Sequence, residues 1–135
     1  MRVLALDVGE KRIGVAISDL SQTLARSLQV IQRSSRQEDF AAVARLTEEY
    51  EAEKVVVGYP RSLDGMAGAQ ARRVERYAAD LAKALTVPVV LWDERFSTVS
   101  AERLMRQAGL RGDKRRERVD AVAAAVILQD YLDSG

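Results

Sequence analysis

The chain has 135 residues, of which 47% are hydrophobic and 30% charged, and its formal net charge is +1. It contains no cysteine and no histidine, which excludes disulfides, thiolate or imidazole zinc sites, cysteine nucleophiles and Ser-His-Asp hydrolysis. A bound metal would need oxygen ligands, and these favour a hard cation such as Mg²⁺ or Mn²⁺. We expect one cytoplasmic domain over 1–135, because no apolar run approaches the ~20 residues that span a bilayer and no signal-peptide core is evident.

The segment 3–8 predicts a strand in the middle of a sheet. Apolar residues occupy both sides of its two-residue period, so both faces of the strand are covered. Asp7 lies near its end, on the same side as Val3 and Ala5 and just before Gly9. The end of a central strand is where α/β proteins place their sites. Hydrogen bonding of Asp7 to the turn at Gly9 is the simpler alternative.

The rest of the chain predicts a β-meander followed by alternating strands and helices. A strand over 12–19 forms an antiparallel hairpin with the first strand, and a strand over 24–32 lies at or near an edge. The charged residues of 36–54 are interpreted as the solvated face of a surface helix. The later elements, in order, are a helix that Ser35 caps, a strand over 54–58, a helix over 68–85, a strand over 87–92, a helix from Ser97 or Thr98 to Gly109, and a helix over 119–128 that is apolar all round and therefore buried. This order predicts a layered α/β fold with a mixed sheet.

Three carboxylates lie in positions that suggest chemistry. Asp7 and Glu94 lie at the ends of strands, and right-handed crossovers bring such ends to one edge of the sheet. Asp120 shares a helical stripe with Ala124, where an apolar residue is expected. Simpler roles exist for two of them: an ion pair of Glu94 with Arg95, and an acid in the first turn of a helix for Asp120. Together the three acids predict a two-metal phosphodiester site, with Asp7 best placed to bridge the metals.

Nucleic acid would supply the phosphodiester bond. Basic residues adjoin two of the acids and are candidates for sequence-independent phosphate contacts, namely Lys11, Arg12, Arg111, Lys114, Arg115, Arg116 and Arg118. A solubilising surface loop is the alternative for the second group. Tyr59 and Phe96 are candidates for stacking on bases, whereas Trp92 is expected to be mostly core.

Four motifs resemble those of the YqgF family, whose members are described as Holliday junction resolvases or pre-16S rRNA nucleases. The motifs are Leu6-Asp7-Val8-Gly9-Glu10-Lys11-Arg12-Ile13-Gly14-Val15-Ala16, Val56-Val57-Gly58-Tyr59-Pro60 with Asp64-Gly65, Asp93-Glu94-Arg95-Phe96-Ser97-Thr98, and Val119-Asp120-Ala121 through Ile127-Leu128-Gln129. The resemblance implies a ribonuclease H-like fold: a five-stranded mixed sheet, second strand antiparallel, flanked by helices. It implies a nuclease dependent on Mg²⁺ or Mn²⁺, with Asp7, Glu94 and Asp120 as metal-binding acids, that processes the 5′ end of ribosomal RNA precursor.

Departures from the family pattern bear on the substrate. Tyr59 and Phe96 stand where Leu is common, and Arg118 where an apolar residue is usual. Resolvase relatives use a further acid after the fourth strand, and Gly58-Tyr59 supplies none, which favours an RNA precursor over a DNA junction as partner. A Holliday junction resolvase and a non-catalytic nucleotide- or RNA-binding assembly factor are the alternatives. No membrane partner is expected, and both a monomer and a homodimer are compatible with the sequence.

Overall fold

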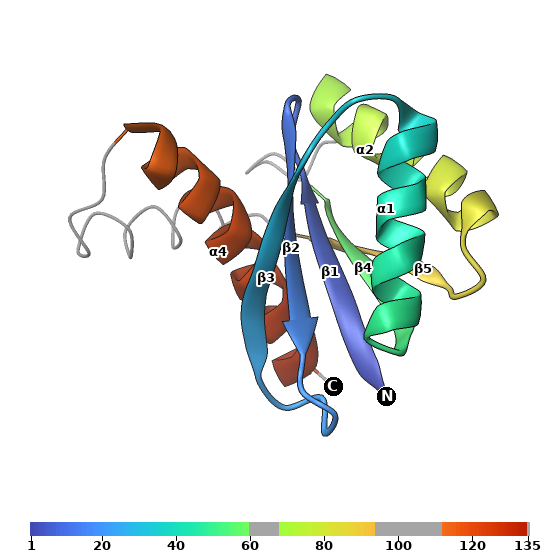
Figure 1. Cartoon of the computed structure of the whole chain (residues 1–135), viewed down its shortest axis with the longest axis vertical. Coiled ribbons are helices and arrows are strands. Elements are labelled where there is room, and N and C mark those ends of the chain that lie inside the picture. The colour runs from blue at the N-terminus through green and yellow to red at the C-terminus, as the bar shows by residue number, and fades with distance from the viewer. Residues whose placement is uncertain (60–67, 94–111, 135) are drawn as a thin grey trace.

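A five-stranded mixed sheet in the order β3-β2-β1-β4-β5 forms the centre of the fold (Figure 1). The computed structural model describes residues 1–59, 68–93 and 112–134. β2 is antiparallel to β1 and β3, whereas β4 is parallel to β1 and β5. The strands are β1 (Arg2–Val8), β2 (Arg12–Ser18), β3 (Ala25–Gln32), β4 (Ala52–Tyr59) and β5 (Val89–Asp93). The ribonuclease H-like sheet with an antiparallel second strand is thereby confirmed.

Helices cover both faces of this sheet, which makes three layers. Helices α1 (Arg36–Glu49) and α2 (Ala69–Ala84) lie on one face, and α4 (Gly112–Ser134) crosses the other (Figure 1). The predicted helix between Ser97 and Gly109 falls outside the described residues. No helix in the described ranges is long and apolar enough to cross a membrane.

The period of two along β1 divides the core between the two faces. The large residues Leu4 and Leu6 pack with α1 and α2, while Val3 and Ala5 pack with α4. β2 divides in the same way, with Val15 toward the first pair of helices and the other face made of small residues such as Ala16. Small side chains on this face let the backbone of α4 lie close to the sheet.

The start of α1 confirms the predicted cap. The Ser35 hydroxyl accepts a hydrogen bond from the Glu38 backbone N–H at 3.1 Å, as an N-cap serine does. The interpretation of the charged residues of 36–54 as a solvated face is wrong for Asp39, which is only 2% exposed. Its neighbours on other elements, described below, explain this burial.

The C-terminal helix is longer than predicted, and it is buried on one side only. α4 begins at Gly112, so most of the basic run of 111–118 is helical. Ala123, Ala124, Ile127 and Leu128 are buried, but Val122, Ala125 and Val126 are only half-buried. The prediction of a helix buried all round was wrong, because a helix that lies on the face of an open sheet presents one stripe to it.

Candidate active site

Asp7 occupies the carboxyl end of the central strand, on the face that α4 covers. Alternation along β1 places it with Val3 and Ala5, and it is half-buried. Its neighbours in both adjoining strands are glycines: Gly14 is its partner in β2, and Gly58 follows Val57, the β4 partner of Leu6. The two glycines place no side chain next to the carboxylate in either adjoining strand. This flanking pair is a feature that reading the strands one at a time did not reveal.

The ends of β1, β4 and β5 meet at one edge of the sheet because the three strands are parallel. Within β5, Val90 pairs with Val56 and Trp92 with Gly58, so the register is continuous up to Asp93, which pairs with Tyr59. Glu94 is the next residue along the chain and lies outside the described residues. The side chain of Tyr59 is also outside the described part of the chain, and so is Phe96.

The last turns of α4 are anchored to β4 and β5. Near its end, Tyr131 accepts a hydrogen bond at 2.9 Å from Lys54, which stands at the beginning of β4, at the opposite edge. This hydrogen bond raises the pKa of the Lys54 ammonium.

Trp92, which was expected to be mostly core, is half-buried. Its indole N–H donates to Asp130 at 2.9 Å, and its ring meets that of Tyr131 edge-on at 5.3 Å.

Asp120 belongs to α4, but its side chain is outside the described residues, as are those of Lys114, Arg115, Arg116 and Arg118. Arg111 precedes the helix and is outside them as well. Among the side chains that the structure describes, no three carboxylates come close enough to hold a metal ion together. The predicted convergence of Asp7, Glu94 and Asp120 therefore remains a prediction.

The turn after Asp7 is closely constrained. The Gly9 N–H donates to the Arg12 carbonyl at 2.8 Å, and a Cβ at Gly9 would stand 2.9 Å from that same oxygen. Real Cβ atoms do not approach so closely, which explains the glycine. Lys11 is exposed in the turn and Arg12 is half-buried at the start of β2, four and five positions after Asp7. Their contact with a phosphate backbone remains a prediction.

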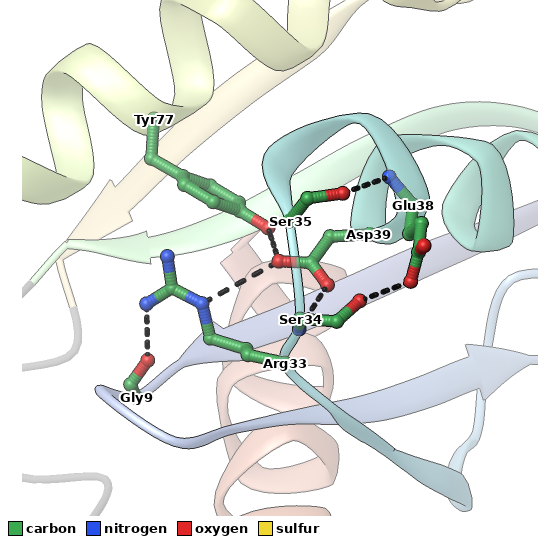
Figure 2. Close-up of polar contacts among 7 residues, drawn as sticks. All are labelled: Gly9, Arg33, Ser34, Ser35, Glu38, Asp39 and Tyr77. Atoms are coloured by element: carbon green, nitrogen blue, oxygen red, sulfur yellow. Dashed lines mark hydrogen bonds and ion pairs between the residues drawn. The ribbon is translucent and has the colours of Figure 1, made fainter.

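A buried polar cluster supports this turn from the face of α1 and α2, and Figure 2 shows its members. Arg33, Asp39 and Tyr77 were not singled out from the sequence. Arg33 follows β3, Asp39 lies in the first turn of α1 and Tyr77 in α2. An acid in the first turn of a capped helix is common on a surface, so only its partners distinguish Asp39.

A pocket of about 200 Å³ adjoins this cluster beside the turn, and its lining includes Glu10, Arg33, Arg36 and Arg73. Each of these arginines pairs with a carboxylate: Arg33 with Asp39, Arg36 with Asp80, and Arg73 with Glu10 at 3.7 Å. Acidic partners therefore balance the arginines that line the pocket.

Comparison with known proteins identifies the family. A sequence model described as RuvX, Holliday junction resolvase, matches residues 1–134. The chain belongs to the RuvX family. The resemblance to YqgF proteins is thereby confirmed, and so is the prediction of an enzyme, because RuvX is a family of nucleases, which are hydrolases acting on phosphodiester bonds in nucleic acid.

Two curated relatives span almost the same length as this RuvX-family chain. A protein of Thermoanaerobacter pseudethanolicus named "Putative pre-16S rRNA nuclease" is 47% identical over 135 residues, which is 99% of this chain and 97% of that protein. A protein of the same name from Bacillus cytotoxicus is 45% identical over 136 residues, with 99% of each chain covered.

Solved structures of the same fold include resolvases with bound DNA. The RuvC protein of T. thermophilus in complex with a Holliday junction substrate superposes with a TM-score of 0.60 at 19% identity, covering 100% of this RuvX-family chain and 96% of that chain. The Fowlpox virus resolvase with its junction DNA gives a TM-score of 0.58 at 13% identity, with coverage of 99% and 98%. At these identities the likeness extends to the fold alone.

Proposed function

We propose that this chain is a divalent-metal-dependent nuclease that processes the 5′ end of ribosomal RNA precursor, with Asp7, Glu94 and Asp120 as its metal-binding acids. The observation that carries the proposal is the position of Asp7. It is a half-buried carboxylate at the carboxyl end of the central strand, between two glycines and on the α4 face. The names of the curated relatives supply the RNA substrate.

The spacing of the other two acids supports their convergence on Asp7. In β5, Trp92 contacts Tyr131 of α4, and Glu94 follows Trp92 by two residues, which is one period of a strand. In α4, Asp120 precedes the buried Ala124 by four residues, about one helical turn. Both spacings favour the face and the edge at which Asp7 lies.

The donor set fits a hard cation, because all three candidate ligands are carboxylates. Bound there, Mg²⁺ or Mn²⁺ would activate a water molecule and stabilise charge on the leaving oxygen. Asp7, on the central strand, would hold the cation together with Glu94 and Asp120. Lys11 and Arg12 follow it in the turn and at the start of β2, and they would hold the phosphate backbone through sequence-independent contacts.

The other predicted nucleic-acid contacts are kept as part of the proposal. Neutralising Arg115 and Arg116 together is expected to weaken binding to all sequences and to flatten its dependence on salt. Unchanged binding to nucleic acid would show that the basic residues of 111–118 serve only to keep the surface soluble. Tyr59 and Phe96 remain the candidates for base stacking, and Arg111, Lys114 and Arg118 for further phosphate contacts.

The central experiment offers purified protein and Mn²⁺ a 5′-labelled ribosomal RNA precursor and a four-way DNA junction in parallel. Asp7→Asn, Glu94→Gln and Asp120→Asn are each expected to abolish cleavage while the melting temperature stays unchanged or rises. Asp133→Asn changes an exposed acid of the same helix and serves as the matched control. Full activity in any of the three variants would remove that residue from the site.

Cleavage of the DNA junction is the second candidate function, and the description of the matching family favours it. Junction cleavage suits a two-fold dimer, whereas trimming of an RNA end needs only a monomer. Cutting of the junction but not of the RNA, by a protein that sediments as a dimer, would establish the second function in place of the first.

A further inference from the structure

Arg33 contacts the turn after Asp7 at two points. Its backbone N–H donates to the Lys11 carbonyl at 2.9 Å. Its guanidinium Nη1 donates to the Gly9 carbonyl at 2.7 Å, a contact that Figure 2 shows. One residue thus holds two alternate carbonyls of a four-residue turn. The turn is also closed from within, because the Gly9 N–H donates to Arg12.

Asp39 holds the guanidinium in the orientation that this contact needs. The Nε of Arg33 lies 3.5 Å from the Asp39 carboxylate, whose side chain is 1% exposed, while the Arg33 side chain is 25% exposed. The carboxylate also accepts from the Ser34 N–H at 3.1 Å and from the Tyr77 hydroxyl at 3.2 Å (Figure 2). Asp39 therefore has three partners from two parts of the chain, the segment after β3 and helix α2.

Tyr77 completes the support by stacking. The Arg33 guanidinium lies over its ring, 4.9 Å from the centroid. A guanidinium is planar and has donors in a fixed fork, so a carboxylate on one edge and a ring on one face determine where its remaining donors point. In this chain they point at Gly9, two residues after Asp7.

We propose that Arg33 and Asp39 are positioning residues for the nuclease reaction: they fix the turn of residues 9–12 from the far face of the sheet and so set the placement of Asp7 and Lys11. The inference rests on the role proposed for Asp7. Burying a carboxylate is costly, and a core of this size could be completed by apolar residues at lower cost. The structure instead uses charged hydrogen bonds, which are short-ranged and directional.

The test compares Arg33→Gln and Arg33→Lys with Arg36→Gln. Glutamine is too short and too weak a donor to bind both Gly9 and Asp39, and a lysine ammonium lacks the fork that reaches both. Arg36 is the matched control, because its guanidinium lies over the same Tyr77 ring at 5.4 Å but pairs with Asp80. All three proteins are compared below their melting temperatures, and Asp39→Asn provides a further variant if Arg33→Gln does not fold.

Two measurements are made on each variant. In metal-free protein, exchange of the Gly9 amide hydrogen, followed by nuclear magnetic resonance, is expected to quicken about tenfold in both Arg33 variants, since a charged hydrogen bond on the turn is lost. With Mn²⁺ and RNA, kcat is expected to fall roughly 10- to 100-fold with KM nearly unchanged, as removal of an outer partner of a metal site does. Arg36→Gln is expected to change neither quantity.

The possible results separate the two proposals. Unchanged Gly9 exchange in Arg33→Gln overturns the inference. Faster exchange with unaltered kcat also overturns it, and the proposed function stands if Asp7→Asn is inactive. If Asp7→Asn is fully active, the proposed function fails and the positioning role fails with it, whatever the amide exchange shows.

Discussion

Replacing Tyr77 with Phe removes one oxygen atom from the buried contact with Asp39. Tyr77 is 2% exposed, and its hydroxyl donates to the Asp39 carboxylate at 3.2 Å. The ring contacts survive the change: Phe40 still meets the ring edge-on at 5.1 Å, and the Arg33 guanidinium still lies over its face. The substitution therefore isolates one hydrogen bond from the packing around it.

The expected loss of stability at pH 7 is about 1.5 kcal/mol, the lower end of the range for a hydrogen bond to a charged group. We choose the lower end because 3.2 Å is long for such a bond. The carboxylate also keeps its contacts with the Ser34 N–H and with Arg33, so no charge is left without a partner.

The difference in free energy of unfolding between the wild type and Tyr77→Phe is expected to become smaller at alkaline pH. Burial, and next the charge of Asp39, raise the pKa of the Tyr77 hydroxyl above its ordinary value of 10.0, while Arg33 and Arg36 oppose this. A group whose pKa is raised in the folded state contributes stability that is complete below its unfolded pKa and is lost as the pH rises toward its folded pKa. At about pH 10.5 the free energy of unfolding of the wild type is expected to be about 0.8 kcal/mol lower for this reason. The Phe variant has no hydroxyl at this position and does not lose this stability.

The assay is urea denaturation followed by circular dichroism, at pH 7 and at steps up to about pH 10.5. Tyr50→Phe, at the half-buried C-cap of α1, controls for the loss of a phenol in general. Equal stability of wild type and Tyr77→Phe at pH 7 would show that the hydroxyl contributes nothing to the cluster. A difference that stays constant up to the highest pH would refute the argument from the raised pKa.

Three further predictions, one of them with a matched control variant, test other parts of the fold by the same denaturation assay. Gly9→Ala places a Cβ 2.9 Å from the Arg12 carbonyl oxygen, so we expect it to lower the free energy of unfolding by about 1–3 kcal/mol and to reduce cleavage. Unchanged stability would show that the backbone of the turn can shift to accept the methyl group. Glu51 has φ 52°, so Glu51→Gly is expected to stabilise by up to about 1 kcal/mol, whereas Ala41→Gly, at an exposed position inside α1, is expected to destabilise by a similar amount. Ile127→Ala empties a fully buried position under the sheet and is expected to cost about 2–5 kcal/mol; a smaller loss would mean that α4 can move to fill the space.

Much of the fold could be predicted from the sequence because its signals are local. The two-residue period of β1 reflects the alternation of side chains along a strand, and it correctly indicated a central strand with two covered faces. The cap at Ser35 was found as predicted because a cap joins residues only three positions apart. For the same reason Asp7 could be placed on the Val3 and Ala5 side before any tertiary contact was known.

The one-sided burial of α4 could not be predicted in this way. Its sequence is apolar all round between residues 119 and 128, and nothing local distinguishes Ile127, which is buried, from Val126, which is half-buried. The sheet it lies on decides which side is covered. Whether Glu94 and Asp120 lie close to Asp7 likewise depends on how the elements pack. The spacing of these residues favours it, and the proposed variants test it.

By itself the sequence determined the order of the elements that the structure describes, the two faces of the central strand and the identity of the acid at its end, because each depends on residues a few positions apart. Only the tertiary structure decided that Asp39 is buried and that Arg33 holds Gly9. The partners in those contacts lie 38 and 24 positions away along the chain, on separate elements. Burial and charge pairing depend on which elements the fold brings together, and no periodicity within one element encodes that.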